Sequence, residues 1–79
     1  MCMKEVYADK YRQIGLKIAY YRKLRGLTQE QLAERLGLSP AFIGHVEAPN
    51  INKAVSLDTL FDVAAALDVP PYKFLQFDE

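Results

Sequence analysis

The spacing of apolar residues along the chain predicts a series of short helices. From about residue 8 to residue 25, apolar side chains recur every three or four positions, which is the helical period. The residues with this spacing are Tyr7, Tyr11, Ile14, Ile18 and Tyr21. A later stripe is formed by Leu57, Leu60, Val63, Ala64 and Leu67. No segment shows the alternation of a strand, so we expect an all-α fold.

Caps and breakers divide this pattern into five expected helices. Gly26 and Gly37 each fit a left-handed helix end. Thr28 precedes Gln31 by three residues, the spacing of a capping box that starts the second helix. The third and fourth helices start from further caps and are limited by prolines, which are Ser39 with Pro40, Pro49, Ser56, Pro70 and Pro71. A fifth helix is expected from Tyr72 to about Leu75.

Size and composition indicate one small globular domain. The chain has 79 residues, of which 51% are hydrophobic and 25% charged. Its single cysteine, Cys2, excludes an internal disulfide and is typical of a cytoplasmic protein. No run approaches the roughly 20 apolar residues that span a bilayer, and charged residues interrupt any early signal sequence. We therefore expect a cytoplasmic protein without membrane contact.

A net charge of zero hides an uneven distribution of charge along the chain. Between Lys10 and Gln29 there are six cations and no carboxylate, namely Lys10, Arg12, Lys17, Arg22, Lys23 and Arg25. From Ala54 to Glu79, five carboxylates (Asp58, Asp62, Asp68, Asp78 and Glu79) stand against Lys73 alone. The basic half permits a polyanionic partner, but it also fits a solvated helix face.

The two helices joined around Gly37 form the arrangement of a helix-turn-helix. The second of them, Ser39–Ala48, turns small or polar residues outward, and such a face can enter a major groove. A small helical bundle with a tight turn explains the same spacing equally well.

Several motifs resemble the XRE-type (phage-repressor and Cro-like) helix-turn-helix family. They are the stretches from Ile14 to Arg22 and from Gly26 to Ala33, the run Leu36-Gly37-Leu38-Ser39 with Ile43 and Glu47, and the stretch from Ser56 to Val69. The resemblance covers about residues 12–75 without a gap. It implies a compact five-helix, lambda-repressor-like domain at 12–75, preceded by an extension and the start of the first helix at 1–11 and followed by a tail at 76–79.

The resemblance also implies roles for single residues. The helix that starts at Ser39 would lie in the major groove, with Pro40, Ala41 and His45 at the base edges. Gln29 matches a position that contacts phosphate. The polar candidates in the following loop are Asn50, Asn52 and Lys53. The expected DNA-binding set further includes Ser39, Phe42, Gly44, Arg22 and Lys23, although Phe42 also fits packing on the second helix. Arg22 and Glu47 match an ion pair between the first helix and the groove helix.

Two departures from the family pattern weaken direct base reading. Pro40 and Ala41 stand where relatives have hydrogen-bonding side chains, which leaves His45 as the groove-facing donor or acceptor. Ala48 and Pro49 stand where relatives often carry a cation and glycine. DNA shape and backbone contacts would then carry more of the selectivity.

The apolar surplus near the C-terminus suggests a homodimer. Phe61 and Ala65 lie off the main stripe of the fourth helix, and Phe74 and Phe77 follow it. These four residues are the expected contact between copies, although the last two also fit packing on their own subunit.

Two classes of function remain open on the sequence. The first is a transcription regulator, expected as a repressor, on the double-stranded DNA of an inverted-repeat operator. The second is a protein-interaction module on the same fold, such as an antitoxin, which the weak hydrogen bonding of Pro40 and Ala41 favours. We expect no enzyme, cofactor, metal or small-molecule ligand, because no catalytic constellation, metal-ligand spacing or Gly-rich phosphate loop occurs.

Overall fold

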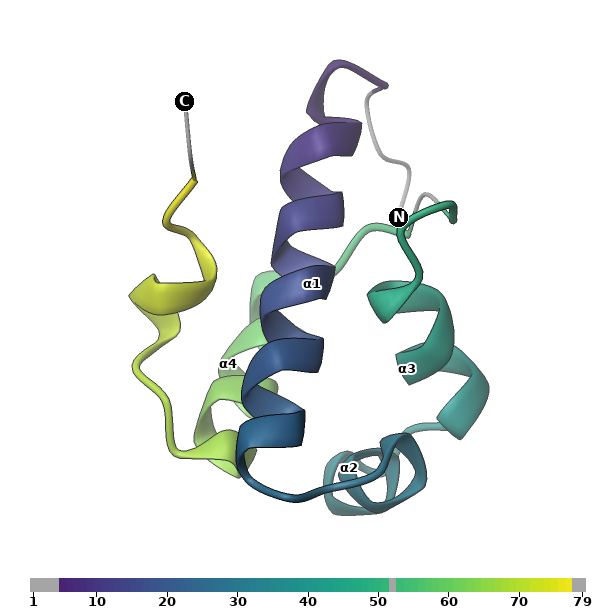
Figure 1. Cartoon of the computed structure of the whole chain (residues 1–79), viewed down its shortest axis with the longest axis vertical. Helices are drawn as coiled ribbons and strands as arrows, with labels where there is room; N and C mark the ends of the chain where they lie inside the picture. Colours follow the sequence, from purple (N-terminus) through teal and green to yellow (C-terminus); the bar gives the residue numbers. More distant parts are fainter. Residues whose placement is uncertain (1–4, 52, 78–79) are drawn as a thin grey trace.

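A computed structural model describes residues 5–51 and 53–77, and within them the chain forms four α-helices and two 3-10 turns (Figure 1). The α-helices are α1 (Ala8–Leu24), α2 (Gln29–Leu36), α3 (Pro40–Glu47) and α4 (Leu57–Leu67), and the 3-10 turns are η1 (Glu5–Tyr7) and η2 (Pro71–Phe74). The described residues include no strand, in agreement with the expected all-α class.

The expected fifth helix is wrong, because η2 is a single 3-10 turn of 4 residues. Pro70 and Pro71 lie at its start, and a proline has no N–H to donate to a helical hydrogen bond. A segment this short closes only the tighter bonds of a 3-10 turn.

The caps expected from the sequence are formed. Thr28 and Gln31 make both hydrogen bonds of a capping box at the start of α2. Ser39 accepts the backbone N–H of Phe42 at 3.1 Å and starts α3, with Pro40 as its first residue. Gly37 ends α2 at a φ of 68°, where a side chain would be strained. These local bonds fix where α2 and α3 begin and how the chain turns between them.

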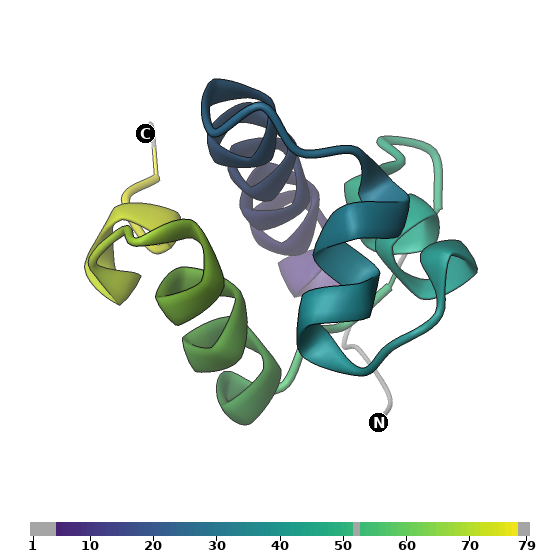
Figure 2. The same cartoon turned by 90° about the horizontal axis from the view of Figure 1, so that it is seen from below.

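The helices enclose one hydrophobic core. Viewed from below, α2 and α3 lie to one side of α1, and α4 with η2 lies to the other (Figure 2). The largest fully buried side chains come from every one of these elements and are Ile18, Leu32, Ile43, Val63, Leu67 and Phe74. Removal of this apolar surface from water is the main force that holds short helices together.

The C-terminal aromatic residues are not where the dimer expectation placed them. Phe74 is 0% exposed, and its ring packs edge-on against Tyr21 with the centroids 5.5 Å apart. Phe77 is half-buried, with the ammonium groups of Lys10 and Lys17 at 4.9 and 5.6 Å from its ring centroid. Phe74 therefore completes the core of its own chain and is unable to anchor a second copy.

Leu57 also differs from the expectation, since it is 59% exposed rather than part of the buried stripe of α4. It is the first residue of α4 and lies one turn before Phe61, which is 49% exposed. The buried stripe begins at Leu60. The two exposed residues give α4 an apolar flank beside its core face.

Candidate nucleic-acid interface

The outer face of α3 carries no Lys, Arg, Asp or Glu side chain. Pro40, Ala41 and His45 are exposed, whereas Ile43 and Val46 are buried against the core. The helix lies at one edge of the molecule in both views (Figures 1 and 2). Three residues, 37–39, separate it from α2. The helix-turn-helix geometry expected from the spacing is thus present, and an edge helix of this kind fits a major groove.

A buried ion pair anchors α3 to α1. The guanidinium of Arg22 donates from Nε to Oε2 of Glu47 at 2.7 Å and from Nη2 to Oε1 at 2.9 Å. Its Nη1 donates to the carbonyl of Leu27 at 2.7 Å. Both residues of the pair are only 7% exposed. Two parallel bonds of this kind fix the orientation of both side chains, so the end of α3 is held in place.

This burial corrects one expected DNA contact. Arg22 was expected both at DNA and in the ion pair, but its donors are turned inward and a phosphate on the surface is out of their reach. Gln29 is half-buried and donates from Nε2 to Oε1 of Glu47 at 3.0 Å. An amide carries two N–H donors, so Gln29 keeps one for a second acceptor.

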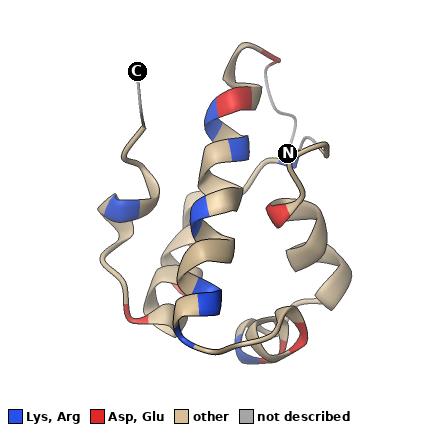
Figure 3. Ribbon diagram, viewed as in Figure 1, with Lys and Arg blue, Asp and Glu red and all other residues tan. Residues whose placement is uncertain are grey.

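Lys and Arg residues lie along the length of α1 (Figure 3), and three guanidinium groups of this expected basic face bond within the molecule. Arg25 donates from Nε to the carbonyl of Leu67 at 2.7 Å, which covers the end of α4. Arg12 forms an ion pair with Asp9, and Lys10 and Lys17 lie over the Phe77 ring. Hydrogen bonds from Arg12 and Gln13 hold the pKa of the Asp9 carboxyl below its ordinary value. The charge run in the sequence therefore overstates the positive charge available to a partner.

The loop after α3 contributes one cation close to the helix. Asn50 and Lys53 are exposed, and the Lys53 ammonium lies 5.3 Å from the centroid of the Phe42 ring. Asn52 lies outside the described residues. Lys23 is exposed at the last turn of α1. Ser39 is engaged as the cap of α3, and its side-chain oxygen accepts a backbone bond.

Gly15 has a structural role that the sequence did not predict. A Cβ atom built on Gly15 would lie 2.0 Å from the carbonyl oxygen of Val46, in the last turn of α3. The backbone of α1 therefore touches the backbone of α3, and only glycine fits at this crossing. Gly44 differs, since its Cβ would meet only the Gln29 side chain at 3.5 Å. In the sequence, Gly15 belongs to the family-like stretch from Ile14 to Arg22, but no local pattern marks the crossing.

Residues 5–51 and 53–77 also lack the features of two other kinds of site. No cluster of three or more His, Cys, Asp or Glu side chains with the geometry of a metal site occurs there. None of the helices in this part of the chain is both long and apolar enough to cross a membrane.

Comparison with known proteins places this geometry among DNA-binding regulators. The family described as helix-turn-helix (HTH_3) matches residues 18–74. The chain is 40% identical over 75 residues to the control protein C.SmaI of Serratia marcescens, which covers 95% of this chain and 79% of that protein. It is 34% identical over 62 residues to the regulator SinR of Bacillus subtilis, where it spans 55% of the relative's length and 78% of its own.

Two solved structures are similar in fold. SinR in complex with DNA superposes with a TM-score of 0.73 at 33% identity, covering 80% of this chain and 98% of the other. The restriction-modification controller protein C.AhdI of Aeromonas hydrophila gives a TM-score of 0.76 at 32% identity, covering 84% and 97%.

Proposed function

Because the chain belongs to the helix-turn-helix family, we propose that it is a transcription regulator that represses genes by inserting α3 into the major groove of an inverted-repeat operator. Its relatives show that the chain is a DNA-binding regulator, and the structure of one relative, SinR, is known in complex with DNA. The observation that carries the proposal is the exposed outer face of α3 on a helix that a buried ion pair holds rigidly.

The outer face of α3 supports close approach to DNA more than rich base reading. Ala41 offers a methyl group that suits a thymine methyl, and His45 offers ring nitrogens for a base edge or a phosphate. Pro40 and Gly44 add no side-chain hydrogen bond, but they are small enough to let α3 approach DNA closely. Selectivity at the remaining positions then depends on the shape of the operator.

A homodimer supports recognition of two half-sites. The extents of one chain are 31 × 23 × 20 Å, and it carries one α3. Half-sites read from the same face of DNA lie about 34 Å apart, so a second copy is needed to place a second α3. Two symmetric copies impose an inverted repeat on the operator.

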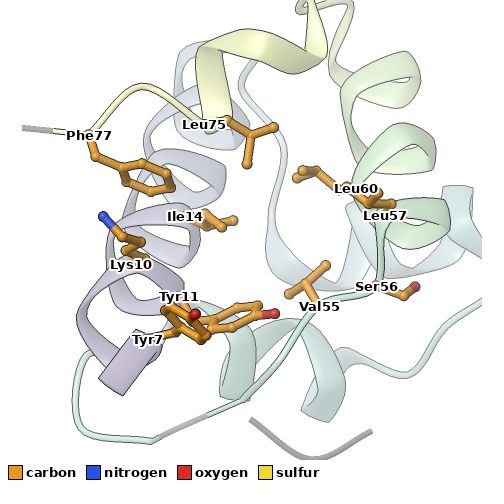
Figure 4. Close-up of a pocket in the computed structure, with 10 residues that line it drawn as sticks. All are labelled: Tyr7, Lys10, Tyr11, Ile14, Val55, Ser56, Leu57, Leu60, Leu75 and Phe77. Atoms are coloured by element: carbon orange, nitrogen blue, oxygen red, sulfur yellow. The ribbon is translucent and has the colours of Figure 1, made fainter. Parts of the chain in front are cut away.

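The apolar flank of α4 is the proposed contact between copies. It consists of Leu57, Phe61 and Ala65, which are exposed at successive turns of the helix. Beside Leu57 lies a groove of about 340 Å³, whose walls carry Tyr7, Leu60 and Leu75 (Figure 4). In Figure 4, Phe77 and Lys10 line the side of the groove opposite Leu57. Exposed apolar surface next to an apolar groove is typical of a protein contact.

Selection of duplexes from a random pool tests the proposal. Enrichment of an inverted repeat with half-sites about one helical turn apart is the expected result. The matched comparison is the same selection with His45→Ala, which removes the hydrogen-bonding side chain from the outer face of α3 and should recover a less defined repeat. Recovery of no preferred duplex by the native chain would contradict operator binding and favour a module that binds protein.

A further inference from the structure

Phe42 lies on the flank of α3, between its outer face and the core. Its neighbour Ala41 is exposed and its neighbour Ile43 is buried, while Phe42 itself is half-buried against the core. One face of its ring meets the ammonium of Lys53, at 5.3 Å from the ring centroid. The two residues belong to different elements, since Lys53 lies in the loop that follows α3.

We propose that Phe42 is a positioning residue that holds the Lys53 ammonium beside α3, ready to contact a DNA phosphate. The inference rests on the proposed function, because it needs α3 to lie in a major groove. The ring then attracts the Lys53 ammonium in addition to packing against the core.

The location of the pair points to a phosphate as its target. When a helix lies in the major groove, its outer face meets base edges and its flanks meet the two phosphate backbones. Helix α3 contains no Lys or Arg, so a cation beside it must come from a neighbouring segment. Lys53 is the described loop residue that supplies one.

The contact with the ring leaves the ammonium able to bind. The ring attracts the positive charge through its face and accepts no conventional hydrogen bond. A lysine ammonium has three N–H donors, which remain available to phosphate oxygens. A long side chain that is already held loses less freedom on binding, so its phosphate contact is strengthened.

A double-mutant cycle measures the contribution of the ring to binding. The variants are Phe42→Leu, Lys53→Met and both together, and affinity is measured on a mixed-sequence duplex about three helical turns long across a range of salt. We expect Lys53→Met to reduce the salt slope by about 0.9. Phe42→Leu should weaken binding about two- to ten-fold when Lys53 is present, because the lysine is then no longer ordered before it binds, and it should have no further effect when methionine replaces that lysine.

Two controls separate this role from packing. Phe42→Tyr keeps an aromatic face and should bind like the native chain. Lys73→Met removes a lysine of η2 on another side of the fold, and the loss caused by Phe42→Leu should be the same with or without it. An equal loss from Phe42→Leu in the native chain and in the Lys53→Met variant would overturn the proposal and leave Phe42 as a packing residue.

A measurement on the native chain avoids any dependence on folded variants. The ring current of Phe42 should shift the Lys53 ε-methylene proton signals upfield, and ordinary lysine shifts there would overturn the contact. If the native chain binds no duplex at all, the proposed function fails. If it binds while the cycle shows no coupling, only the inference about Phe42 fails.

Discussion

At the scale of single residues, two glycines of this chain predict opposite outcomes for the same substitution. Gly15→Ala forces a methyl group against the Val46 carbonyl, so α1 and α3 must separate. We expect a loss of about 1–3 kcal/mol in the free energy of unfolding, measured by urea denaturation, together with weaker DNA binding. Gly44→Ala is the matched control for the unfolding measurement, because its methyl group meets only the Gln29 side chain, at 3.5 Å.

The control variant should change the free energy of unfolding in the opposite direction. Alanine is a better helix former than glycine, so Gly44→Ala should raise the free energy of unfolding by about 0.5–1 kcal/mol. Equal stability of both alanine variants and the native chain would contradict the close crossing at Gly15.

His45 gives a residue-scale prediction about selectivity. Its exposed ring is the hydrogen-bonding side chain on the outer face of α3. We expect His45→Ala to bind the selected operator more weakly, by about 1–3 kcal/mol, while its affinity for an unrelated duplex changes less. Competition between the two duplexes measures the difference. An equal loss on both duplexes would place His45 at a phosphate instead of a base.

Roles that depend on neighbouring residues in the chain could be predicted from the sequence. Roles that depend on contacts between distant segments could not. The caps at Thr28 and Ser39 act within three residues of themselves, so the pattern alone reveals them. The pairing of Arg22 with Glu47 joins positions 25 residues apart and came only from the family resemblance. The crossing at Gly15 depends on how two helices pack in space, which no local pattern encodes.

At the scale of elements, the ion pair between α1 and α3 predicts a large effect on stability. Glu47→Ala leaves the buried guanidinium of Arg22 without its carboxylate. Breaking a buried pair in this way costs about 3–5 kcal/mol, a large share of the total for a small domain. Thermal unfolding measures it.

A second variant tests the physical reason for that loss. Joint replacement of Arg22 by Met and Glu47 by Leu removes both charges, and it should be much less destabilising than Glu47→Ala alone. An unchanged melting temperature for Glu47→Ala would contradict the burial of the pair.

The first turn of α1 predicts a dependence of stability on pH. Arg12 and Gln13 hydrogen bond to Asp9 and lower its pKa below 3.8. A carboxyl whose pKa is lower in the folded state adds stability above its unfolded pKa, and this stability is lost as the pH falls through the folded value. Asp9→Asn should therefore lower the melting temperature slightly at pH 7 and have no effect well below pH 3.8. A difference that persists in strong acid would contradict this linkage.

The elements themselves were predicted to the extent that their signals are strong. The four α-helices follow from periodicity and caps, whereas the fifth reduces to the turn η2 because two prolines leave it too few hydrogen bonds. Leu57 fitted the stripe of α4 by type, yet it is exposed because the N-terminal end of that helix lies beside a groove instead of the core.

At the scale of the whole molecule, the cations near α1 and the carboxylates of α4 give these two surfaces different partners. Three guanidinium groups of the basic segment are engaged within the fold, because Arg22 is buried against Glu47, Arg12 pairs with Asp9 and Arg25 bonds to a backbone carbonyl of α4. The salt dependence of DNA binding should accordingly be modest for each copy, since each phosphate contact contributes about 0.9 to the slope. The apolar flank of α4 carries Asp58 and Asp62 nearby, and these carboxylates keep that surface from DNA.

The last prediction concerns the dimer. It uses a variant that should keep the fold but lose the contact between copies. Phe61 is 49% exposed, so Phe61→Glu should leave the chain folded while it places a charge in the apolar flank of α4. We expect the native chain to sediment as a dimer at micromolar concentrations and the variant as a monomer. Operator affinity should fall steeply, because a single α3 reads one half-site.

Leu24→Glu is the matched control for this test. Leu24 is 59% exposed and is the last residue of α1, a different helix from the one that carries Phe61. The same change of apolar side chain to carboxylate there should leave the dimer intact. If the native chain sediments as a monomer, or if Phe61→Glu remains a dimer, the contact between copies does not lie on α4. In the second case, two α3 helices would still reach both half-sites, but through a different surface that sets their separation.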